Sequence, residues 1–246
     1  MSTIIGIIPA RYASTRLPGK PLIMIGGKTM IQRVYEQAKK VTELDEVYVA
    51  TDDARIADAV KNFGGHAILT SPYHQSGTDR CSEVLKKLNK QVDVVINIQG
   101  DEPFIDPAQI ALVASCFNDA SVNIASLIKK LDKESEVQNP NTVKAVINSL
   151  GNALYFSRSP IPYRRNPEAH ITYYKHIGIY GYRPQTLIDL TRLPQGAIEK
   201  AESLEQLRWL ENGYDIRLKE TNMETISIDT PDDLMKAEAY VKANKE

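Results

Sequence analysis

A loop rich in cations follows the first apolar run of the chain. The stretch IIGIIPARYASTRLPGKPL begins at Ile4, and beyond its apolar run it carries Arg11, Arg16 and Lys20. Three cations in a loop are compatible with an ordinary solvated surface. Their neighbours favour a ligand, because Ser14 adds a hydroxyl and Gly19 leaves the backbone open to phosphate oxygens. Arg binds phosphate through paired hydrogen bonds and Lys adds a mobile charge, so the loop is typical of a triphosphate site.

Two aspartates stand at the ends of apolar runs far apart in the chain. Asp101 follows the run in VVINIQGDEPF, and Asp229 follows the run in ETISIDTPDD. Either residue alone is more typical of a helix cap or a turn. Together, facing a cationic loop, they offer the hard oxygen ligands that Mg²⁺ takes alongside phosphate and water. The pair therefore predicts a Mg²⁺ site.

Two familiar nucleotide motifs are absent from the sequence. GGKT at residues 26–29 resembles the end of a Walker A loop, but position 22 is Leu where that motif requires Gly. No G-x-G-x-x-G follows the first apolar run, which disfavours a nicotinamide dinucleotide enzyme.

The elements that must position these residues alternate along the chain. Strands are predicted at residues 4–9, 46–51, 66–70 and 93–99, and helical spacing of apolar residues lies at 30–41, 56–63 and 84–88. This alternation predicts an α/β fold, a doubly wound and mainly parallel sheet with helices on both faces. Ligands of such sheets bind beyond the carboxyl ends of the strands, where the opening loop and Asp101 would lie.

The region from about residue 133 to residue 183 differs from the rest. TVKAVINS, ALYFS and ITYYKHIGIYGYR read as consecutive strands without long helices between them. We therefore expect one domain over residues 1–246, with a β-rich lobe inserted at about 133–183. Helical patterns return at 204–211, and a last helix is predicted from Pro231, where Pro suits the first turn.

Within the last of these strands, His176, Gly178 and Tyr180 share one face. A His and a Tyr flanking a Gly leave a gap in which a polar ligand could lie against the backbone. A half-exposed sheet face explains the same pattern equally well.

The amino-acid composition limits the classes of protein to which the chain can belong. The 246 residues include 30 Lys and Arg against 31 Asp and Glu, so no overall field would attract nucleic acid or a membrane. Cys81 and Cys116 are far apart and lack a CxxC partner, which disfavours a disulfide framework or a zinc site and suits a reducing cytoplasm. We expect no signal peptide, and no apolar run approaches the ~20 residues that span a bilayer.

Eight segments together resemble one family, in order and over nearly the whole chain. They are IIPARYASTRLPGKPL, ATDD, HQSGTDR, INIQGDEPF, YFSRSPIPY, KHIGIYGYR, LEQLRWLENG and DTPDDL. The family is 3-deoxy-manno-octulosonate cytidylyltransferase, or CMP-Kdo synthetase. The resemblance implies a single nucleotidyltransferase domain with a nucleotide-diphospho-sugar transferase-like fold, in which the lobe at about 133–183 serves sugar binding and dimerisation. It also implies a homodimer, and conversion of CTP and Kdo to CMP-Kdo and pyrophosphate with Mg²⁺. The product would serve lipopolysaccharide biosynthesis.

The resemblance also implies roles for individual residues. The triphosphate would be held by Arg11, Ser14, Arg16 and Lys20. Ser76, Gly77 and Arg80 would close the nucleotide pocket, with Gln99 near the nucleotide. Lys20, Asp101 and Asp229 would be catalytic, the two aspartates as Mg²⁺ ligands. The sugar acid would be bound by Arg158, His176, Tyr180, Glu205 and Gln206.

Two other functions remain compatible with the sequence. A related nucleotidyltransferase for sialate or a hexose 1-phosphate would use the same loop and Asp101. A catalytically silent nucleotide-binding protein is also possible, although such a protein need not keep Lys20, Asp101 and Asp229.

Overall fold

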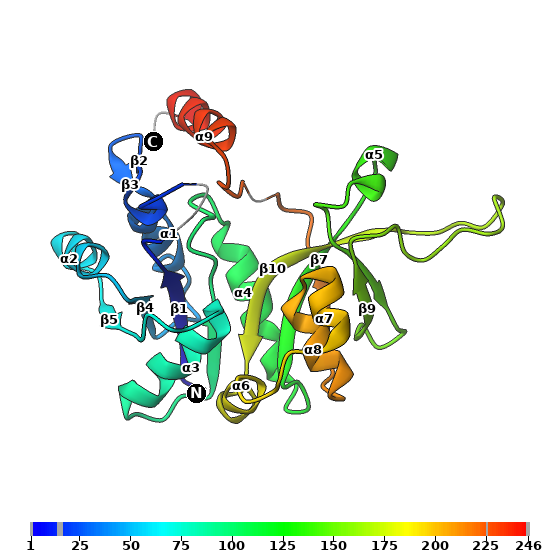
Figure 1. Cartoon of the computed structure of the whole chain (residues 1–246), viewed down its shortest axis with the longest axis horizontal. Helices are drawn as coiled ribbons and strands as arrows, with labels where there is room; N and C mark the ends of the chain where they lie inside the picture. The colour runs from blue at the N-terminus through cyan, green and yellow to red at the C-terminus, as the bar shows by residue number, and fades with distance from the viewer. Residues whose placement is uncertain (1, 14–16, 225, 245–246) are drawn as a thin grey trace.

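A mixed β-sheet with helices on both faces forms the body of the molecule (Figure 1). The computed structural model describes residues 2–13, 17–224 and 226–244. The parallel half of the sheet contains β1 (Ile4–Ala10), β4 (Glu46–Thr51), β5 (Ala67–Leu69) and β6 (Val94–Asn97). The other half contains β7 (Ile124–Lys130), β10 (Tyr174–Tyr182) and β11 (Arg217–Glu220).

The order of strands across the sheet is β11-β7-β10-β6-β1-β4-β5. β10 runs antiparallel to both β6 and β7, whereas β11 is parallel to β7. The sheet is thus mainly parallel, with β10 as the reversed strand at its centre. The predicted strands at 4–9, 46–51, 66–70 and 93–99 correspond to β1, β4, β5 and β6.

The sheet is covered by helices on each face. The helices are α1 (Met30–Ala38), α2 (Ala54–Asn62), α3 (Gly77–Leu88), α4 (Pro107–Ser115), α6 (Pro184–Leu190), α7 (Ala197–Glu202) and α8 (Glu205–Glu211). Apolar residues of α1, α2 and α4 join one core cluster, and those of α3, α6 and α8 join another. On β6, Ile96 belongs to the first core and Val95 to the second. Burial on both faces explains why these strands are continuous apolar runs.

A small hairpin and the last helix pack together at one edge. β2 (Met24–Ile25) and β3 (Lys28–Thr29) are joined by Gly26 and Gly27, whose φ angles are 53° and 81°. Positive φ at both positions is the geometry of a tight hairpin turn, so the GGKT segment is a turn and not a phosphate loop. α9 (Pro231–Asn244) packs beside this hairpin in a third core cluster. No helix among the described residues is long and apolar enough to cross a membrane.

The segment predicted as a β-rich lobe extends from β10. It holds α5 (Glu134–Gln138) and the antiparallel pair β8 (Lys144–Ile147) and β9 (Ala153–Ser157), and β8 pairs with the start of β10. Because β10 also lies in the central sheet, lobe and body share that strand. Between β9 and β10, residues 158–173 leave the body as an extended arm (Figure 1).

A buried lysine fixes the root of this arm. Lys144 has no exposed surface, and its ammonium donates to the carbonyl oxygens of Asn139, Thr142 and Arg158 at 2.9, 2.6 and 2.5 Å. A buried cation needs such partners because its desolvation is costly. The three carbonyls therefore hold the loop before β8 and the start of the arm together.

Candidate active site

A cleft of about 290 Å³ opens beyond the carboxyl ends of β1 and β6. Its lining is Pro9, Ala10, Arg11, Lys20, Pro21, His74, Gln75, Ser76, Gly77, Arg80, Gln99, Gly100, Asp101 and Asp229. The opening loop thus lies at the ligand-binding end of the sheet, as the alternation of strands and helices predicts.

Lys20 joins the two aspartates in this cleft. Its Nζ lies 2.9 Å from Asp101 Oδ2 and 3.1 Å from Asp229 Oδ1. The Lys20 side chain is 13% exposed, while those of Asp101 and Asp229 are 31% and 42% exposed. The two carboxylates therefore sit side by side with their charges partly offset and still accessible from the cleft.

Backbone contacts bring these three segments together. The Ile228 amide donates to the Asp101 carbonyl at 3.0 Å, which places Asp229 beside Asp101. Gly19 has a φ of 67° and caps the short 3₁₀ turn η1 (Lys20–Leu22), and its amide donates to the Tyr12 carbonyl at 3.0 Å. Gly100 packs so closely on the end of β1 that a Cβ there would lie 2.6 Å from the Pro9 carbonyl oxygen. Glycine at 19 and at 100 thus lets both loops reach the same point.

The two aspartates suit Mg²⁺ by donor type and number. Among residues 2–13, 17–224 and 226–244, no group of three or more His, Cys, Asp or Glu could hold a metal ion. An ion at Asp101 and Asp229 would therefore need further oxygen ligands from phosphate and water. Binding through one or two carboxylates and substrate phosphates is the usual pattern for Mg²⁺.

The start of α3 forms another part of the cleft wall. Ser76 caps the helix by accepting from the Asp79 amide at 3.2 Å, and Asp79 accepts from the Ser76 amide at 3.1 Å. Arg80, on the first turn, is 4% exposed. Its guanidinium contacts Asp52 Oδ2 at 3.2 Å and Thr70 Oγ1 at 2.8 Å, so its direction is fixed by two neighbouring strand ends.

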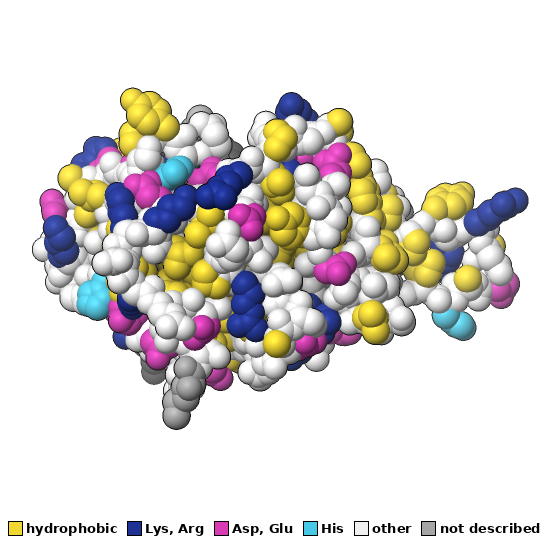
Figure 2. All heavy atoms as spheres, turned by 90° about the horizontal axis from the view of Figure 1, so that it is seen from below, with side chains coloured by type: hydrophobic (Ala, Val, Ile, Leu, Met, Phe, Trp, Pro, Cys, Tyr) yellow, Lys and Arg dark blue, Asp and Glu magenta, His cyan; other side chains and the backbone are white. Residues whose placement is uncertain are grey.

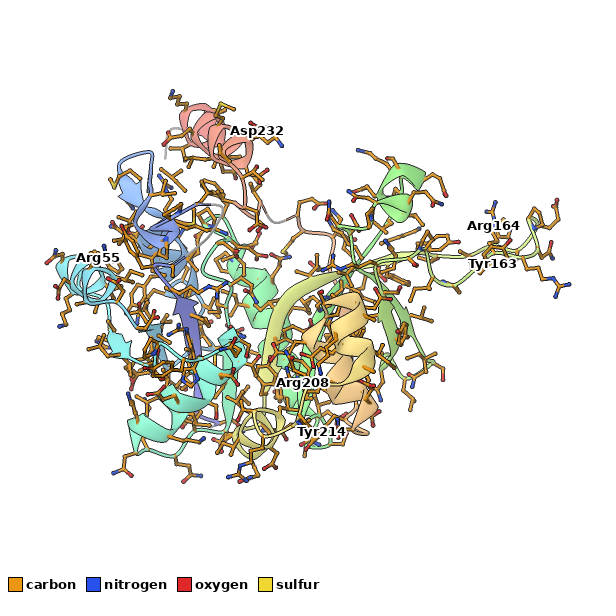
Figure 3. All side chains as sticks on the ribbon, in the orientation of Figure 1. Arg55, Tyr163, Arg164, Arg208, Tyr214 and Asp232 are labelled. Atoms are coloured by element: carbon orange, nitrogen blue, oxygen red, sulfur yellow. The ribbon has the colours of Figure 1, made fainter. Side chains whose placement is uncertain are left out.

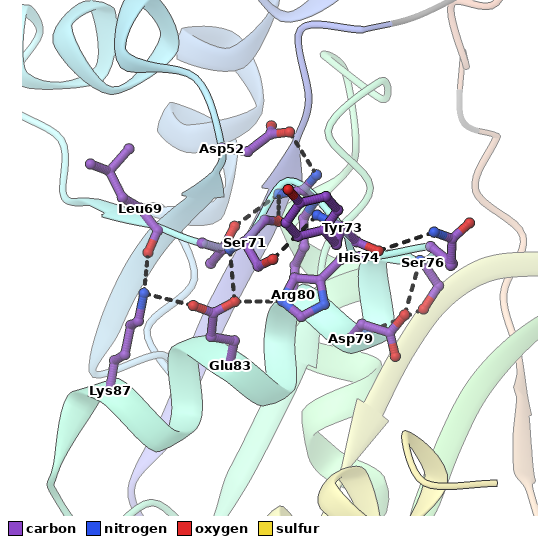
Figure 4. A network of polar contacts seen from close by, with 12 residues as sticks. Asp52, Leu69, Ser71, Tyr73, His74, Ser76, Asp79, Arg80, Glu83 and Lys87 are labelled. Atoms are coloured by element: carbon purple, nitrogen blue, oxygen red, sulfur yellow. Dashed lines mark hydrogen bonds and ion pairs between the residues drawn. The ribbon is translucent and has the colours of Figure 1, made fainter.

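Glu83 anchors the loop that precedes α3 (Figure 4). Its carboxylate accepts from the Ser71 amide at 2.9 Å and contacts His74 Nε2 at 2.5 Å and Lys87 Nζ at 2.6 Å. Burial opposes ionisation, but the hydrogen bonds from Lys87, Ser71 and His74 prevail and lower the pKa of Glu83 to about 2. The network therefore fixes His74, one of the residues that line the cleft.

The structure describes most, but not all, of the residues predicted to bind the nucleotide. Arg11, Lys20, Ser76, Gly77, Arg80 and Gln99 all line the cleft. Ser14 and Arg16 lie outside the described residues. Gln99 also points toward the adjacent strand, because its Nε2 donates to the Gly178 carbonyl at 2.7 Å.

His176 and Tyr180 share one face of β10, as their spacing predicts. Their ring centroids are 5.3 Å apart, and His176 also packs edge-on against Phe156 at 5.0 Å. A Cβ added at Gly178 would meet no atom within 4 Å, so the predicted gap at that position is present. The pairing of β10 with β7 shifts register between Ile177 and Tyr180.

Both rings carry polar groups suited to a neutral ligand contact. His176 Nε2 lies 2.9 Å from Ser126 Oγ, and burial lowers the pKa of His176 to about 3. The imidazole is therefore neutral at pH 7 and would not act as a cation toward a carboxylate. The Tyr180 hydroxyl is buried without a hydrogen-bond partner among the described residues.

Glu205 and Gln206 begin α8 next to this face. Glu205 Oε2 accepts from Thr78 Oγ1 at 3.0 Å, and burial raises the pKa of Glu205. Gln206 is 5% exposed. Trp209 is buried and packs edge-on against Tyr180, at 5.0 Å between ring centroids, so it belongs to the core.

Arg158 lies apart from this group. Its Nε donates to the Glu202 carbonyl at 2.7 Å, and its Nη1 donates to the Pro140 carbonyl at 3.1 Å. It is not among the residues that line the cleft. In this structure the Arg158 guanidinium therefore bonds to backbone carbonyls at the root of the arm.

Several residues near the site escape sequence reasoning. Ser126 orients His176, Thr78 donates to Glu205, and Glu102 follows Asp101 as a carboxyl 7% exposed. Burial and the neighbouring Asp101 raise the pKa of Glu102 to about 8. The S-x-x-D capping pattern at Ser76 does predict the start of α3, and hence the placement of Thr78 on its first turn. No local pattern indicates Ser126.

Comparisons with known proteins agree with this geometry. The cytidylyltransferase family model matches residues 5–223. The chain is 57% identical to a 3-deoxy-manno-octulosonate cytidylyltransferase of Parabacteroides distasonis, over 98% of this chain and 99% of that protein. It is 55% identical to the enzyme of the same name from Bacteroides thetaiotaomicron, over 97% and 98% of the two chains.

One solved structure matches the fold of this chain closely. It is CMP:2-keto-3-deoxy-manno-octonic acid synthetase complexed with CTP, and it matches with a TM-score of 0.94 and 47% identity over 99% of this chain and 100% of that one. The predicted family resemblance and the predicted fold class, a nucleotidyltransferase-like α/β sheet, are both confirmed.

Proposed function

The chain belongs to the cytidylyltransferase family, and from this premise we propose that it transfers the cytidylyl group of CTP to Kdo, releasing pyrophosphate. The observation that carries the proposal is the cluster of Lys20 with Asp101 and Asp229, at 2.9 and 3.1 Å, in a cleft beyond the strand ends. An ammonium beside two accessible carboxylates suits a polyphosphate and a divalent cation.

In the proposed reaction the anomeric hydroxyl of Kdo attacks the α-phosphorus of CTP. A new oxygen–phosphorus bond forms, the bond from the α-phosphorus to the bridging oxygen breaks, and pyrophosphate leaves. The proton of the hydroxyl passes to solvent. Because charge grows on the leaving group, Lys20 and Arg11 in the cleft would stabilise the transition state.

Asp101 and Asp229 would hold Mg²⁺, which when bound neutralises phosphate charge and makes a coordinated hydroxyl more acidic. The chain itself supplies the arrangement. Lys20 contacts both carboxylates and offsets their mutual repulsion, and the Ile228 amide fixes one aspartate beside the other.

The acceptor would lie on the His176–Tyr180 face, next to Gly178. The unpartnered Tyr180 hydroxyl, the neutral His176 ring and the Glu205 carboxylate offer hydrogen bonds to sugar hydroxyls. Gln99 lines the nucleotide cleft and bonds to Gly178, so this face adjoins the cleft. Gln206 and Arg158 remain proposed sugar contacts, and Arg158 would have to exchange its carbonyl partners for the sugar carboxylate.

The proposal includes a homodimer in the cytoplasm. The arm carries Tyr163, which is 85% exposed, and Figure 3 places Tyr163 and Arg164 far out on it. Figure 2 shows hydrophobic and basic side chains along the projecting arm. An aromatic and basic projection suits a protein partner. Both cysteines are free and buried, which suits a reducing compartment. Light scattering at several concentrations would test the dimer.

An acceptor panel tests the proposed function. Pyrophosphate release is followed with CTP and Mg²⁺ and, in separate reactions, Kdo, N-acetylneuraminate or a hexose 1-phosphate. We expect turnover with Kdo exceeding the others by at least about 100-fold, since buried groups built for one set of hydroxyls stay unpaired with another. A preference for sialate or a hexose 1-phosphate would show that Kdo is not the acceptor. CTP binding without turnover on any acceptor would indicate a catalytically silent nucleotide-binding protein.

A further inference from the structure

Two hydrogen bonds connect the nucleotide cleft with the acceptor face. Gln99 Nε2 donates to the Gly178 carbonyl at 2.7 Å, and Thr78 Oγ1 donates to Glu205 Oε2 at 3.0 Å. The second bond joins residues 127 positions apart. Thr78 directly follows Gly77, which lines the cleft, and is itself 2% exposed. Thr78 is therefore the buried link between the two sites.

The direction of the Thr78 hydroxyl is fixed by its helix. Thr78 lies on the first turn of α3, which the reciprocal bonds of Ser76 and Asp79 cap. A β-branched side chain in a helix has few rotamers. Glu205, by contrast, is a long side chain at the start of α8, and its carboxylate needs a partner to be held in one place.

The groups around Glu205 come from three elements. From α3 and its N-cap, Thr78 and Ser76 donate to its carboxylate, Asp79 adds negative charge, and Cys81 is a buried neutral thiol. From α8, Arg208 Nη2 lies 4.0 Å from Glu205 Oε1 (Figure 3 shows Arg208 on this helix). From β10, Tyr180 and Tyr182 face it as neutral phenols. Burial and Asp79 favour the protonated acid, and Thr78, Ser76 and Arg208 favour the carboxylate.

We propose that Thr78 is a positioning residue for the acceptor. Its hydroxyl lies on the helix whose first residues line the nucleotide cleft, and it holds the Glu205 carboxylate in place and in its charged form. The inference rests on the proposed function, in which Glu205 contacts the sugar acid. Its physical basis is the fixed donor on α3, the long side chain on α8 and the near absence of solvent at Thr78.

Thr78→Val tests this role because Val keeps the shape of Thr and removes the hydroxyl. With CTP saturating and Kdo varied, we expect kcat/KM for Kdo to fall about 10- to 100-fold, the effect of losing one hydrogen bond to a charged group. Most of the change should appear in KM for Kdo, and CTP affinity measured alone with Mg²⁺ should stay within about twofold.

The pH profile separates positioning from a general structural effect. Without its donor, Glu205 takes up a proton more readily, so the acid limb of kcat/KM for Kdo should move to higher pH in Thr78→Val. Thr78→Ser keeps the hydroxyl and should restore both the rate and the profile. Ser82→Ala is the matched control, since Ser82 is a buried hydroxyl one turn further along α3 that has no hydrogen-bond partner among the described residues.

Glu205→Gln distinguishes failure of this inference from failure of the proposed site. If Glu205→Gln impairs Kdo kinetics and Thr78→Val does not, Thr78 has no positioning role. If Glu205→Gln leaves Kdo kinetics unchanged, the acceptor placement itself is wrong. Thr78→Val added to Glu205→Gln should cause no further loss, and an additive loss, or an equal loss in Ser82→Ala, contradicts the proposal. Thr78→Ala serves the same comparisons if the Val variant fails to fold.

Discussion

The ammonium of Lys20 lies 2.9 Å from the Asp101 carboxylate, although 81 residues separate them in the chain. The same ammonium reaches Asp229 at 3.1 Å. One positive charge against two negative charges leaves this cluster of three residues net negative, which a divalent cation would offset. The pairing of Lys20 with Asp101 therefore joins the phosphate-binding loop to the proposed metal ligands.

Replacing either aspartate should remove most activity without unfolding the protein. Asp101→Asn and Asp229→Asn each delete one ligand charge, so at limiting Mg²⁺ we expect turnover to fall by about 100-fold or more. Both side chains are partly exposed, at 31% and 42%, so thermal unfolding should shift little. A variant with near-normal turnover at limiting Mg²⁺ would remove that residue from the metal site.

Lys20→Ala should act through the triphosphate. Leaving-group charge grows in the transition state, so we expect a loss of about 2–4 kcal/mol in transition-state stabilisation, seen in turnover and in CTP affinity. Lys28→Ala is the matched control, because Lys28 is 46% exposed and pairs with Glu36 on the surface. If Lys20→Ala changed only the KM for the sugar acid, the loop would be wrongly placed.

Much of this arrangement follows from the sequence, for identifiable reasons. The parallel strands are buried on both faces, so β1, β4 and β6 read as apolar runs, and their carboxyl ends locate Arg11 and Asp101. β7 and α4 were not predicted: the α4 sequence is apolar on most sides and lacks a clear helical stripe. The Lys20–Asp229 contact depends on the Ile228–Asp101 backbone bond, which no spacing reveals.

The acceptor side was less accessible to sequence reasoning. The shared face of His176 and Tyr180 follows from strand alternation, although the register shift after Ile177 does not. The resemblance places Arg158 among the sugar-acid contacts, whereas its bonds to the Glu202 and Pro140 carbonyls come from tertiary packing of the arm. Thr78 and Ser126 act through partners distant in sequence, so only the folded chain identifies them.

Truncating the acceptor face should separate the two substrates. The Tyr180 hydroxyl is buried and has no hydrogen-bond partner in the described part of the chain. Tyr180→Phe should therefore not reduce stability, and kcat/KM for Kdo should fall about tenfold through the lost ligand contact. Gln206→Ala should act in the same direction. Calorimetry of CTP with Mg²⁺ should match the wild type, and an equal loss of CTP binding would place these residues on the nucleotide side.

His176 should contribute as a neutral ring. Because burial lowers its pKa to about 3, its ring is uncharged at pH 6 and at pH 8. His176→Gln should raise KM for Kdo about tenfold, and by the same factor at both pH values. If instead the difference in KM for Kdo between the wild type and His176→Gln disappeared as the pH rose through about 6.5, His176 would be binding the sugar acid as a cation.

Glu83 should stabilise the loop beside the cleft in a pH-dependent way. Its pKa is lowered from 4.5 to about 2, so its contribution is fully present above about 4.5 and is lost as the pH falls toward 2. At pH 7, Glu83→Gln should lower the free energy of unfolding by about 1–3 kcal/mol.

Urea unfolding of the wild type and of Glu83→Gln at pH 7 and pH 3 measures the difference between their free energies of unfolding. This difference should be smaller at pH 3. Glu43→Gln, at an exposed carboxyl outside the network, serves as the control and should change neither value. A Glu83 effect of the same size at pH 7 and pH 3 would show that the carboxylate charge is not what holds the loop.

The central claim is direct transfer of the cytidylyl group to Kdo, and one labelling measurement tests it. The protein is incubated with CTP labelled with ³²P at the α-phosphate, Kdo and Mg²⁺, and the products are separated and identified by mass. We predict that the label appears in CMP-Kdo in a 1:1 ratio with released pyrophosphate, and that Asp101→Asn forms little of either. Label that remains in CTP, or that appears as CMP without a sugar conjugate, would contradict the account.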